Sequence, residues 1–328
     1  MAAENVIRPR QAMVLAAGVG HRLRPLTEKR PKVLAPVANC PVINGTIHRL
    51  RRTGCERLVV NVHHLAGQVE AFLDGAVEPG LEIKISREDE ILGTGGGLGK
   101  AKKFFDLEPL ILINGDILTN LDLAALWNYH HQSGNWATLA VQDHPDYNQV
   151  AVDGDGRLMG ISDRLPGGSA DEAVRVAFTG IHVLGPEMFE YLPGDRPASI
   201  IDIYLDLVSM GKPVGTMFSQ GHYWLDIGTP ANYLRAHGDL AAGLFDPLEV
   251  LGAAARLPDV GPGTKLGEGT SLLGATVVGK NCRIGDGVSL INTVVWDDVE
   301  ITPGIRLENC VLGDGCRVTE SATDKVFA

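Results

Sequence analysis

Residues 11–24 of the chain read QAMVLAAGVGHRLR, and the fold follows from this stretch. The apolar run 12–16 ends at a glycine-rich loop, which is the form of a buried strand that leads into a turn. Gly18 and Gly20 allow the backbone to bend tightly and to point N–H groups at an anion, and Arg22 adds a guanidinium group suited to phosphate. Ligands of open α/β sheets bind at the carboxyl ends of the strands, so this loop is a candidate phosphate site.

The same alternation of short apolar runs with helical patterns continues to about residue 240. It predicts a layered, Rossmann-like α/β domain with a largely parallel sheet. The expected strands are 12–16, 58–62, 81–85, 110–113, 138–141, 180–184 and 214–218, and the expected helices are 42–52, 98–104, 121–131, 199–210 and 230–240.

The C-terminal part of the chain has a different pattern, in which branched aliphatic residues recur every six positions among frequent glycines. Such a period is typical of a parallel β-helix, in which each repeat forms one face of a triangular coil. We therefore expect two domains, an α/β domain over residues 1–245 and a small left-handed parallel β-helix of three to four coils over residues 246–328. The repeat positions are Val260, Leu266, Leu272, Val278, Ile284, Leu290, Val295, Ile301, Leu307, Leu312 and Val318.

Composition narrows the class of protein. The chain carries 29 Lys and Arg against 40 Asp and Glu, and its formal charge of −11 argues against a nucleic-acid-binding protein. No apolar run approaches the roughly 20 residues of a membrane span, and no apolar signal segment follows the N-terminus. The five cysteines include no C-x-x-C pair, so neither a disulfide framework nor a zinc site is indicated. We expect a cytoplasmic protein.

A second motif, RPKVLAPV over residues 30–37, follows the glycine loop closely. Pro31 stiffens the approach to Lys32, whose ammonium group could reach the phosphates held by the loop. The loop itself is not a dinucleotide fingerprint, because Leu23 stands where the third glycine of G-x-G-x-x-G belongs, and it lacks the G-K-[ST] of a Walker motif.

Together, L-A-A-G-x-G-x-R-L-x-P-L-T over residues 15–27 and P-K-x-L-x-P-V over residues 31–37 resemble the signature of the sugar-nucleotide pyrophosphorylases. These nucleotidyltransferases join a nucleoside triphosphate to a sugar 1-phosphate and release pyrophosphate. The resemblance continues through NGD at 114–116, GIHVL at 180–184 and WLDIGTP at 224–230, and it ends in the hexapeptide repeats that many members append.

The resemblance implies roles for particular residues. Arg22, Lys32 and Asp116 would be catalytic, with Arg22 and Lys32 holding the triphosphate. Asp116 and Asp226 would bind Mg²⁺, which suits two carboxylates that share an ion with nucleotide phosphates. Taken singly, Asp116 reads equally well as a helix cap and Asp226 as a turn residue. The nucleotide-binding residues would be Leu15, Ala16, Ala17, Gly18, Gly20, Glu90, Gly93, Thr94, Gly95 and Asn114.

Residues 90–98, EILGTGGGL, resemble the glutamate-led version of a segment found in mannose-1-phosphate guanylyltransferases and related uridylyltransferases. A plain strand–helix turn would need one of these glycines, not four. The glutamine-led version usual in thymidylyl- and glucose-uridylyltransferases is absent. The sugar-phosphate contacts would come from Asn148, Arg164 and Gly180, with Arg164 in place of the lysine that relatives commonly carry.

The first expectation is therefore a mannose-1-phosphate guanylyltransferase that uses GTP. The alternative is a uridylyltransferase for an N-acetylmuramate- or hexosamine-type 1-phosphate. A non-catalytic nucleotide-sugar sensor would be favoured by loss of any residue of the Arg22, Lys32, Asp116 and Asp226 set, and all four are present. An acyltransferase role for the β-helix is disfavoured because residues 246–328 contain no histidine. We expect this β-helix to make the contacts of a homo-oligomer.

Overall fold

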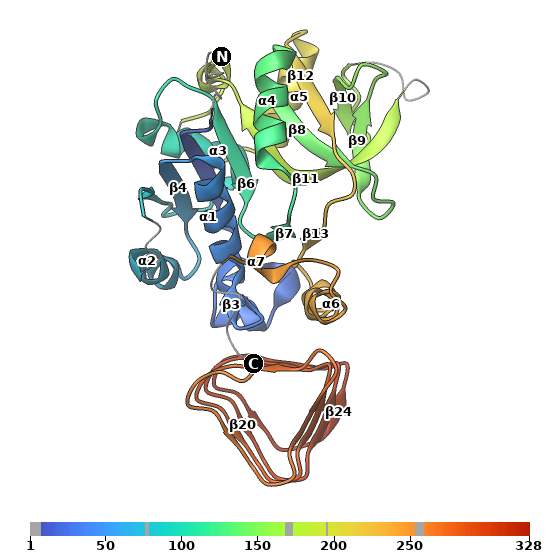
Figure 1. The fold of residues 1–328 in the computed structure, drawn as a ribbon. Coiled ribbons are helices and arrows are strands. Elements are labelled where there is room, and N and C mark those ends of the chain that lie inside the picture. The colour runs from blue at the N-terminus through green and yellow to red at the C-terminus, as the bar shows by residue number, and fades with distance from the viewer. Residues whose placement is uncertain (1–7, 76–78, 168–172, 195, 253–258) are drawn as a thin grey trace, which may run out of the picture.

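The computed structural model describes residues 8–75, 79–167, 173–194, 196–252 and 259–328, and a nine-stranded sheet forms its centre (Figure 1). The main path of the sheet runs β10-β9-β11-β6-β1-β4-β5, and β8 pairs with both β11 and β12. The strands are β1 (Gln11–Leu15), β4 (Arg57–Val62), β5 (Glu82–Arg87), β6 (Leu110–Asn114), β8 (Ala137–Gln142), β9 (Asn148–Val152), β10 (Leu158–Ile161), β11 (Val174–Leu184) and β12 (Val214–Phe218).

The expectation of a largely parallel sheet was wrong for half of it. β5, β4, β1 and β6 form a parallel block, whereas β11 runs antiparallel to β6, β8 and β9. The short turn between β9 and β10 allows only an antiparallel pair, because a parallel pair needs a long crossover, whereas the direction of β11 is set by its pairing with strands distant in the sequence. The glycine loop nevertheless follows β1 in the middle of the parallel block, where a ligand site was expected.

Helices cover both faces of the sheet. One layer holds α1 (Val42–Thr53), α2 (Ala66–Gly75) and α4 (Leu123–Ser133), and the other holds α3 (Gly93–Ala101) and α5 (Ile200–Ser209). Alternation along β1 serves the two layers, since Ala12 and Val14 belong to the first core and Met13 to the second. The expected helix over 42–52 is confirmed, and Gly54 ends it in the left-handed conformation at a φ of 117°.

Short elements extend the domain toward the C-terminal part of the chain. The two-stranded sheet of β7 (Ile117–Thr119) and β13 (Trp224–Asp226) lies beside α6 (Pro230–Ala241), and α7 (Pro247–Val250) packs on α1. The loop after β1 contains three single turns of 3-10 helix, η1 (His21–Leu23), η2 (Leu26–Glu28) and η3 (Lys32–Leu34), followed by the pair β2 (Pro36–Val37) and β3 (Cys40–Pro41).

The C-terminal part is a triangular prism of stacked coils, consistent with the expected left-handed parallel β-helix (Figure 1). Parallel pairing joins Lys265 to Arg283, Arg283 to Glu300 and Glu300 to Arg317, so each coil takes about three six-residue repeats. The three faces are β14-β17-β20-β23, β15-β18-β21-β24 and β16-β19-β22-β25. Their strands are Lys265–Leu266, Arg283–Ile284, Glu300–Ile301 and Arg317–Val318; Ser271–Leu273, Ser289–Ile291, Arg306–Glu308 and Ala322–Thr323; and Val277–Val278, Val294–Val295, Val311–Leu312 and Val326–Phe327.

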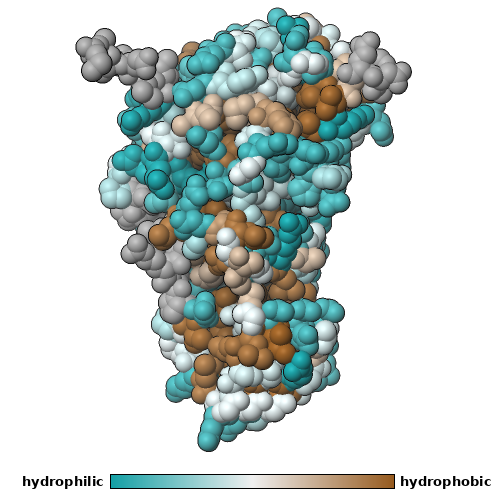
Figure 2. Space-filling model, turned by 45° about the vertical axis from the view of Figure 1, so that its right-hand side comes forward, coloured by the Kyte–Doolittle hydropathy of each residue, from teal (hydrophilic) through white to brown (hydrophobic). Residues whose placement is uncertain are grey.

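Most repeat positions form the core of the prism, from Val278 to Val318. Leu266 departs from the pattern and is 44% exposed, because β14 is the end strand of its face and only β17 covers it. Hydrophobic side chains reach the surface of the β-helix in the view of Figure 2. Homo-oligomer contacts through this part of the chain stay a prediction, as does the division between residues 245 and 246.

The β-helix packs against the α/β domain through a third apolar cluster. Val294, Trp296 and Val311 from one face of the prism meet Leu26 and Tyr233 of the other part. Among the residues that the structure describes, none of the helices combines the length and the apolar character needed to cross a bilayer. A cytoplasmic location stays a prediction.

Candidate active site

A cavity of about 200 Å³ opens at the carboxyl ends of β1, β4 and β6, beside the start of α3. Nine of the residues singled out from the sequence line it: Leu15, Ala16, Ala17, Gly18, Lys32, Gly93, Thr94, Asn114 and Asp116. A Cβ built on Gly18 would have no neighbouring atom within 4 Å. The backbone of the glycine loop is therefore bare on its open side, which is the property that close approach of a phosphate requires.

Two cations and two carboxylates alternate at one side of this cavity. The Lys32 Nζ is paired with the Asp116 carboxylate and lies 3.4 Å from Asp226 Oδ1, and the Arg22 guanidinium donates to Asp226 Oδ2 at 2.9 Å. Asp116 follows β6 directly, and Asp226 ends β13 opposite Ile117 of β7. The β7–β13 pairing thus brings together two carboxylates that are far apart in the sequence.

The electrostatic environment keeps both cations charged. Burial lowers the pKa of the Lys32 ammonium, but the nearby Asp116 and Asp226 carboxylates raise it more, so the net pKa lies above its ordinary value. The hydrogen bond that Arg22 donates to Asp226 raises the pKa of Arg22. Arg22 keeps 60% of its side chain exposed, so one of the two cations lies at the mouth of the site.

Gly228 allows these charged groups to converge. Its backbone N–H donates to Asp226 Oδ1 at 2.7 Å, and a Cβ at this position would stand 2.6 Å from an Arg22 nitrogen and 2.9 Å from Lys32 Nζ. Any side chain here would push the two cations apart. The sequence motif contained this glycine, but its role follows only from the packing.

Asn61 and Glu88 line the cavity and were not identified from the sequence. Both are almost fully buried, and Asn61 Nδ2 donates to Glu88 Oε1 at 2.7 Å. The other side of the amide accepts from the Ala16 N–H at 2.9 Å, while Glu88 Oε2 accepts from the Leu92 N–H at 3.0 Å. This network fixes the glycine loop relative to the start of α3. A polar residue inside the apolar strand 58–62 was the available signal.

Three predicted nucleotide-binding residues do not line the cavity. Glu90 is exposed, and Glu88 stands at the site instead. Gly20 begins η1 in the left-handed conformation, and a Cβ there would lie 2.8 Å from Thr27 Cγ2. Gly95 packs on α5, with its N–H donating to the Ala198 carbonyl at 2.9 Å.

Close packing also explains the other glycines of the 93–97 run. The Gly96 N–H shares the Ala198 carbonyl, and a Cβ on Gly97 would come within 2.6 Å of Glu88 Oε1. The glycines beyond the one that a plain strand–helix turn needs therefore have a packing role. The run lets α3 approach α5 and Glu88 closely.

The predicted sugar-phosphate residues are dispersed. Gly180 touches the site, because a Cβ on it would lie 2.7 Å from the Asn114 amide. Asn148 starts β9 and its amide is engaged with Asp143 at 2.8 Å and with the His144 N–H at 2.9 Å. Arg164 is exposed and forms an ion pair with Asp202 of α5 at 2.7 Å, so the structure does not bring it to the Lys32 cluster.

A pair of aromatic side chains lies beside Asp226 and was likewise not predicted. Tyr147 and Trp224 make an edge contact at 5.4 Å between ring centroids. Asn232 of α6 donates to the Tyr147 hydroxyl at 3.2 Å and to the Asp226 carbonyl at 2.8 Å. The Trp224 indole N–H donates to the Thr179 carbonyl, next to Gly180. These groups connect Asp226 with the Gly180 side of the cavity.

The donor set fits a hard divalent cation that also uses substrate oxygens. Within the described part of the chain, no three His, Cys, Asp or Glu side chains gather to hold a metal by themselves. Asp116 and Asp226 provide two carboxylates on one side of Lys32. Mg²⁺ is commonly bound by one or two carboxylates together with phosphate oxygens and water, so two carboxylates suffice if a polyphosphate completes the shell.

A family model described as nucleotidyl transferase matches residues 11–243. A UTP–glucose-1-phosphate uridylyltransferase of Synechocystis is 28% identical, over 93% of this chain and 88% of the relative. A mannose-1-phosphate guanylyltransferase of Mycobacterium tuberculosis is 28% identical over 90% and 82%, respectively. An N-acetylmuramate alpha-1-phosphate uridylyltransferase of Neisseria meningitidis is 32% identical over 67% of this chain and 93% of its own length.

Proposed function

The chain belongs to the nucleotidyl transferase family and is a sugar-1-phosphate nucleotidyltransferase, and from that premise we propose that it transfers the guanylyl group of GTP to mannose 1-phosphate. The products would be GDP-mannose and pyrophosphate. The observation that carries the proposal is the convergence of Arg22, Lys32, Asp116 and Asp226 beside the glycine loop.

The choice of mannose and guanine rests on the number of guanylyltransferases among the relatives that match almost the full chain, although the Synechocystis uridylyltransferase also matches 93% of it. Mannose-1-phosphate guanylyltransferases of Arabidopsis thaliana and Mycobacterium tuberculosis match 95% and 90% of it, respectively, β-helix included. Uridylyl transfer is the second candidate, and the uridylyltransferases of Synechocystis and Neisseria meningitidis support it at similar identity. Because of these two relatives, both glucose 1-phosphate and N-acetylmuramate 1-phosphate should be tested as acceptors.

The cavity holds part of the nucleotide. At about 200 Å³ it is smaller than the roughly 300 Å³ at which sites for whole drug-sized ligands begin. We place the nucleoside between the loop at residues 15–18 and the start of α3, where Glu88 and Asn61 supply buried polar atoms. The triphosphate would then leave the cavity along Lys32 toward the exposed Arg22.

Positioning and charge neutralisation suffice for the chemistry. A sugar phosphate is already ionised at pH 7, so its oxygen attacks the α-phosphorus in line without a general base. The Lys32 ammonium and the Arg22 guanidinium would neutralise the charge that develops on the departing pyrophosphate. Lys32 is paired with two carboxylates, so binding of the triphosphate would exchange these partners for phosphate oxygens.

Asp116 and Asp226 would hold the Mg²⁺ ion. When bound, the ion would neutralise phosphate charge and fix the triphosphate geometry. Arg22 bridges to Asp226, and Gly228 holds Asp226 Oδ1 through its N–H, so both contacts orient that carboxylate for the ion.

The experiment is a measurement of pyrophosphate release with Mg²⁺ for GTP, UTP, dTTP, CTP and ATP against mannose, glucose, N-acetylglucosamine and N-acetylmuramate 1-phosphates. We expect GTP with mannose 1-phosphate to be the fastest pair, and release to stop when the metal is chelated. A fastest pair containing UTP would replace the guanylyl proposal by the uridylyl one. A folded protein that binds nucleotide sugars but releases no pyrophosphate with any pair would favour a sensor.

A further inference from the structure

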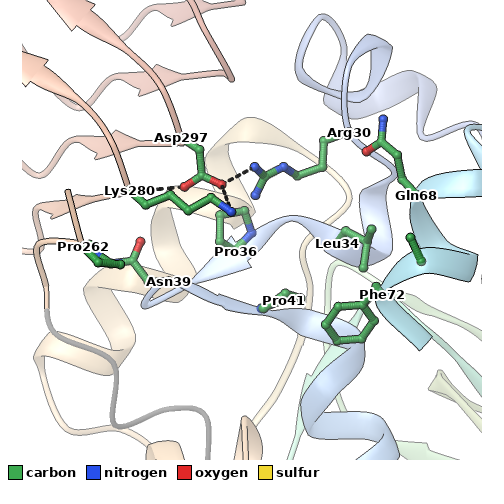
Figure 3. A pocket seen from close by; sticks show the side chains of 12 residues that line it. Arg30, Leu34, Pro36, Asn39, Pro41, Gln68, Phe72, Pro262, Lys280 and Asp297 are labelled. Atoms are coloured by element: carbon green, nitrogen blue, oxygen red, sulfur yellow. Dashed lines mark hydrogen bonds and ion pairs between the residues drawn. The ribbon is translucent and has the colours of Figure 1, made fainter. Parts of the chain in front are cut away.

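The segment from Arg30 to Pro36 separates two cavities. Lys32 and Val33 line the candidate active site, whereas Arg30 and Leu34 line a second cavity of about 580 Å³. Figure 3 shows this second cavity between α2, the β2–β3 hairpin and the first coils of the β-helix. One face of the segment therefore lines the candidate active site. The other face lines the second cavity, at the junction of the α/β domain and the β-helix.

Arg30 bridges that junction. Its Nε and one terminal nitrogen bind the two carboxylate oxygens of Asp314 at 2.8 and 2.6 Å, and that nitrogen also lies 2.6 Å from Asp297 Oδ2. The guanidinium stands 5.1 Å over the Trp296 ring, and the side chain is only 17% exposed. A bidentate, largely buried arrangement of this kind holds an arginine in one geometry.

The other end of the segment is fixed by the same β-helix coil. The Pro36 carbonyl accepts a hydrogen bond from the Tyr233 hydroxyl, which in turn accepts from the Trp296 indole N–H at 2.8 Å. Trp296 and Tyr233 are both fully buried. Two adjacent β-helix residues thus contact both ends of the segment, Asp297 at Arg30 directly and Trp296 at Pro36 through Tyr233.

Val33, Leu34 and Ala35 pack into the apolar clusters, whereas Arg30 borders the cavity and is held there by its ion pairs. The ion pairs cross this gap, as the dashed lines to Asp297 in Figure 3 show. Pro31 lies between Arg30 and Lys32, and its ring restricts its backbone φ, which removes one of the torsions that could absorb a displacement of Arg30.

We infer that Arg30 is a positioning residue for Lys32, and that the β-helix sets the geometry of the active site through Asp314 and Asp297. The inference rests on the proposed function for the role of Lys32. It gives the C-terminal part a task within a single chain, in addition to any contact between chains. Loss of the Arg30 anchor should weaken charge neutralisation at the leaving pyrophosphate while leaving the nucleoside cavity in place.

The test is a double-mutant cycle on the full chain, with Arg30→Gln, Lys32→Met and the combination. We expect Arg30→Gln to lower kcat at least tenfold while the KM for the sugar 1-phosphate changes less than threefold, and Arg30→Lys to recover part of the loss. In the Lys32→Met background, Arg30→Gln should cost less than twofold. A further tenfold loss in that background would show that Arg30 does not act through Lys32 and would overturn the inference.

The matched control is Glu300→Gln, which removes another β-helix carboxylate whose partner is Arg317 on the same sheet. It should leave kcat unchanged, whereas Asp314→Asn should behave like Arg30→Gln. If Arg30→Gln does not fold, Asp314→Asn and Arg30→Lys carry the test in its place. Wild-type kcat in Asp314→Asn would then overturn the inference, whereas Arg30→Lys is expected to lie between Asp314→Asn and the wild type.

A second readout needs no turnover and separates this inference from the proposed function. Acetylation of Lys32 by acetic anhydride, followed by peptide mass spectrometry, should be at least fivefold faster in Arg30→Gln than in the wild type or in Glu300→Gln. An unchanged rate would contradict the inference whatever reaction the enzyme catalyses. An accelerated rate in a protein without nucleotidyltransferase activity would keep the coupling and remove the proposed function.

Discussion

The α/β domain and the β-helix keep their important polar groups in different places. In the α/β domain they stand at the ends of strands, as Asp116 does after β6 and Asp226 at the end of β13. In the β-helix, Asp297 and Asp314 lie at equivalent positions of neighbouring coils, where the Asp297 N–H donates to Asp314 Oδ1 at 3.1 Å. Strand ends of an α/β sheet are recognised sites for chemistry, whereas nothing in a coil repeat marks one turn as different from the next.

A regular sequence repeat therefore predicts the fold of a region more readily than the function of its individual residues. The six-residue period predicts the prism, and its residues then look interchangeable. Trp296, Asp297 and Asp314 are distinguished from the other repeat residues only by their contacts with the α/β domain. Trp296 donates to Tyr233, and the two carboxylates bind Arg30. Substitutions at residues that act in the reaction should lower kcat, whereas substitutions at residues that only support the fold should lower stability.

Asp116→Ala should have the largest effect on turnover. Removal of this carboxylate takes away a ligand of the expected ion and one partner of Lys32, so kcat should fall at least about 10³-fold while the fold persists. Steady-state pyrophosphate release and circular dichroism measure the two quantities. Asp74→Ala, on the exposed surface of α2, is the control, and near-wild-type rates in Asp116→Ala would refute the metal assignment.

Lys32→Met should lower kcat by roughly 10²- to 10³-fold, the usual cost of losing one group that stabilises transition-state charge. The volume of the side chain is nearly kept, so Asp116 loses its cation and Asp226 keeps only Arg22, without a change in packing. Rates for Lys32→Met and for Lys29→Met, which alters the exposed neighbouring lysine, should differ by that factor. Equal rates would exclude Lys32 from the reaction.

Glu88→Gln should have a smaller effect, mainly on nucleotide binding. The amide of the variant can accept only one of the two hydrogen bonds that Asn61 Nδ2 and the Leu92 N–H now donate, which costs roughly 1–3 kcal/mol. The KM for the nucleoside triphosphate should rise about tenfold with little change in kcat. Glu90→Gln is the matched exposed control two residues away, and a larger effect there would restore the original assignment of Glu90.

Leu290→Ala should change stability and leave the reaction almost unaffected. Leu290 is fully buried in the prism, so truncation should lower the free energy of unfolding by about 2–5 kcal/mol. Leu266→Ala, at the partly exposed end position, should cost less than about 1 kcal/mol. Denaturant unfolding gives both values, and kcat measured well below the melting temperature should match the wild type in both variants.

The stability of the two parts should also differ in its pH dependence. Burial lowers the pKa of His130 and of His237 to about 4, and that of His182 to about 3. A histidine with a depressed folded-state pKa binds its proton in the unfolded chain first, so stability falls as the pH drops below about 6.5. Residues 246–328 contain no histidine. Hydrogen exchange at pH 7 and pH 5 should therefore show increased opening in the α/β domain and little change in the β-helix.

Local pattern predicted much of the fold, since the strands at 58–62, 110–113 and 214–218 and the helix at 42–52 lie almost where they were expected. The direction of β11 was missed, because pairing between distant strands decides it and the strand itself looks the same in either direction. The prism was predicted as a whole because its period is local.

The residues of the candidate site that belong to sequence motifs were predicted. Lys32, Asp116 and Asp226 were identified through their motifs, and the structure brings them together. The choice of Glu88 over Glu90 was not predictable, because it depends on where the Leu92 N–H and the Asn61 amide lie once α3 has packed on α5. Arg30 stood inside a recognised motif, yet its partners come from coils some 270 residues later in the chain.

Transfer of a nucleotidyl group at the α-phosphorus can be followed directly by ³¹P NMR of one complete reaction with the most productive substrate pair. We expect loss of the triphosphate and sugar-phosphate resonances, and equal growth of pyrophosphate and of the two coupled phosphorus signals of a nucleotide sugar. Signals of a nucleoside diphosphate with a doubly phosphorylated sugar, or of inorganic phosphate alone, would contradict this expectation.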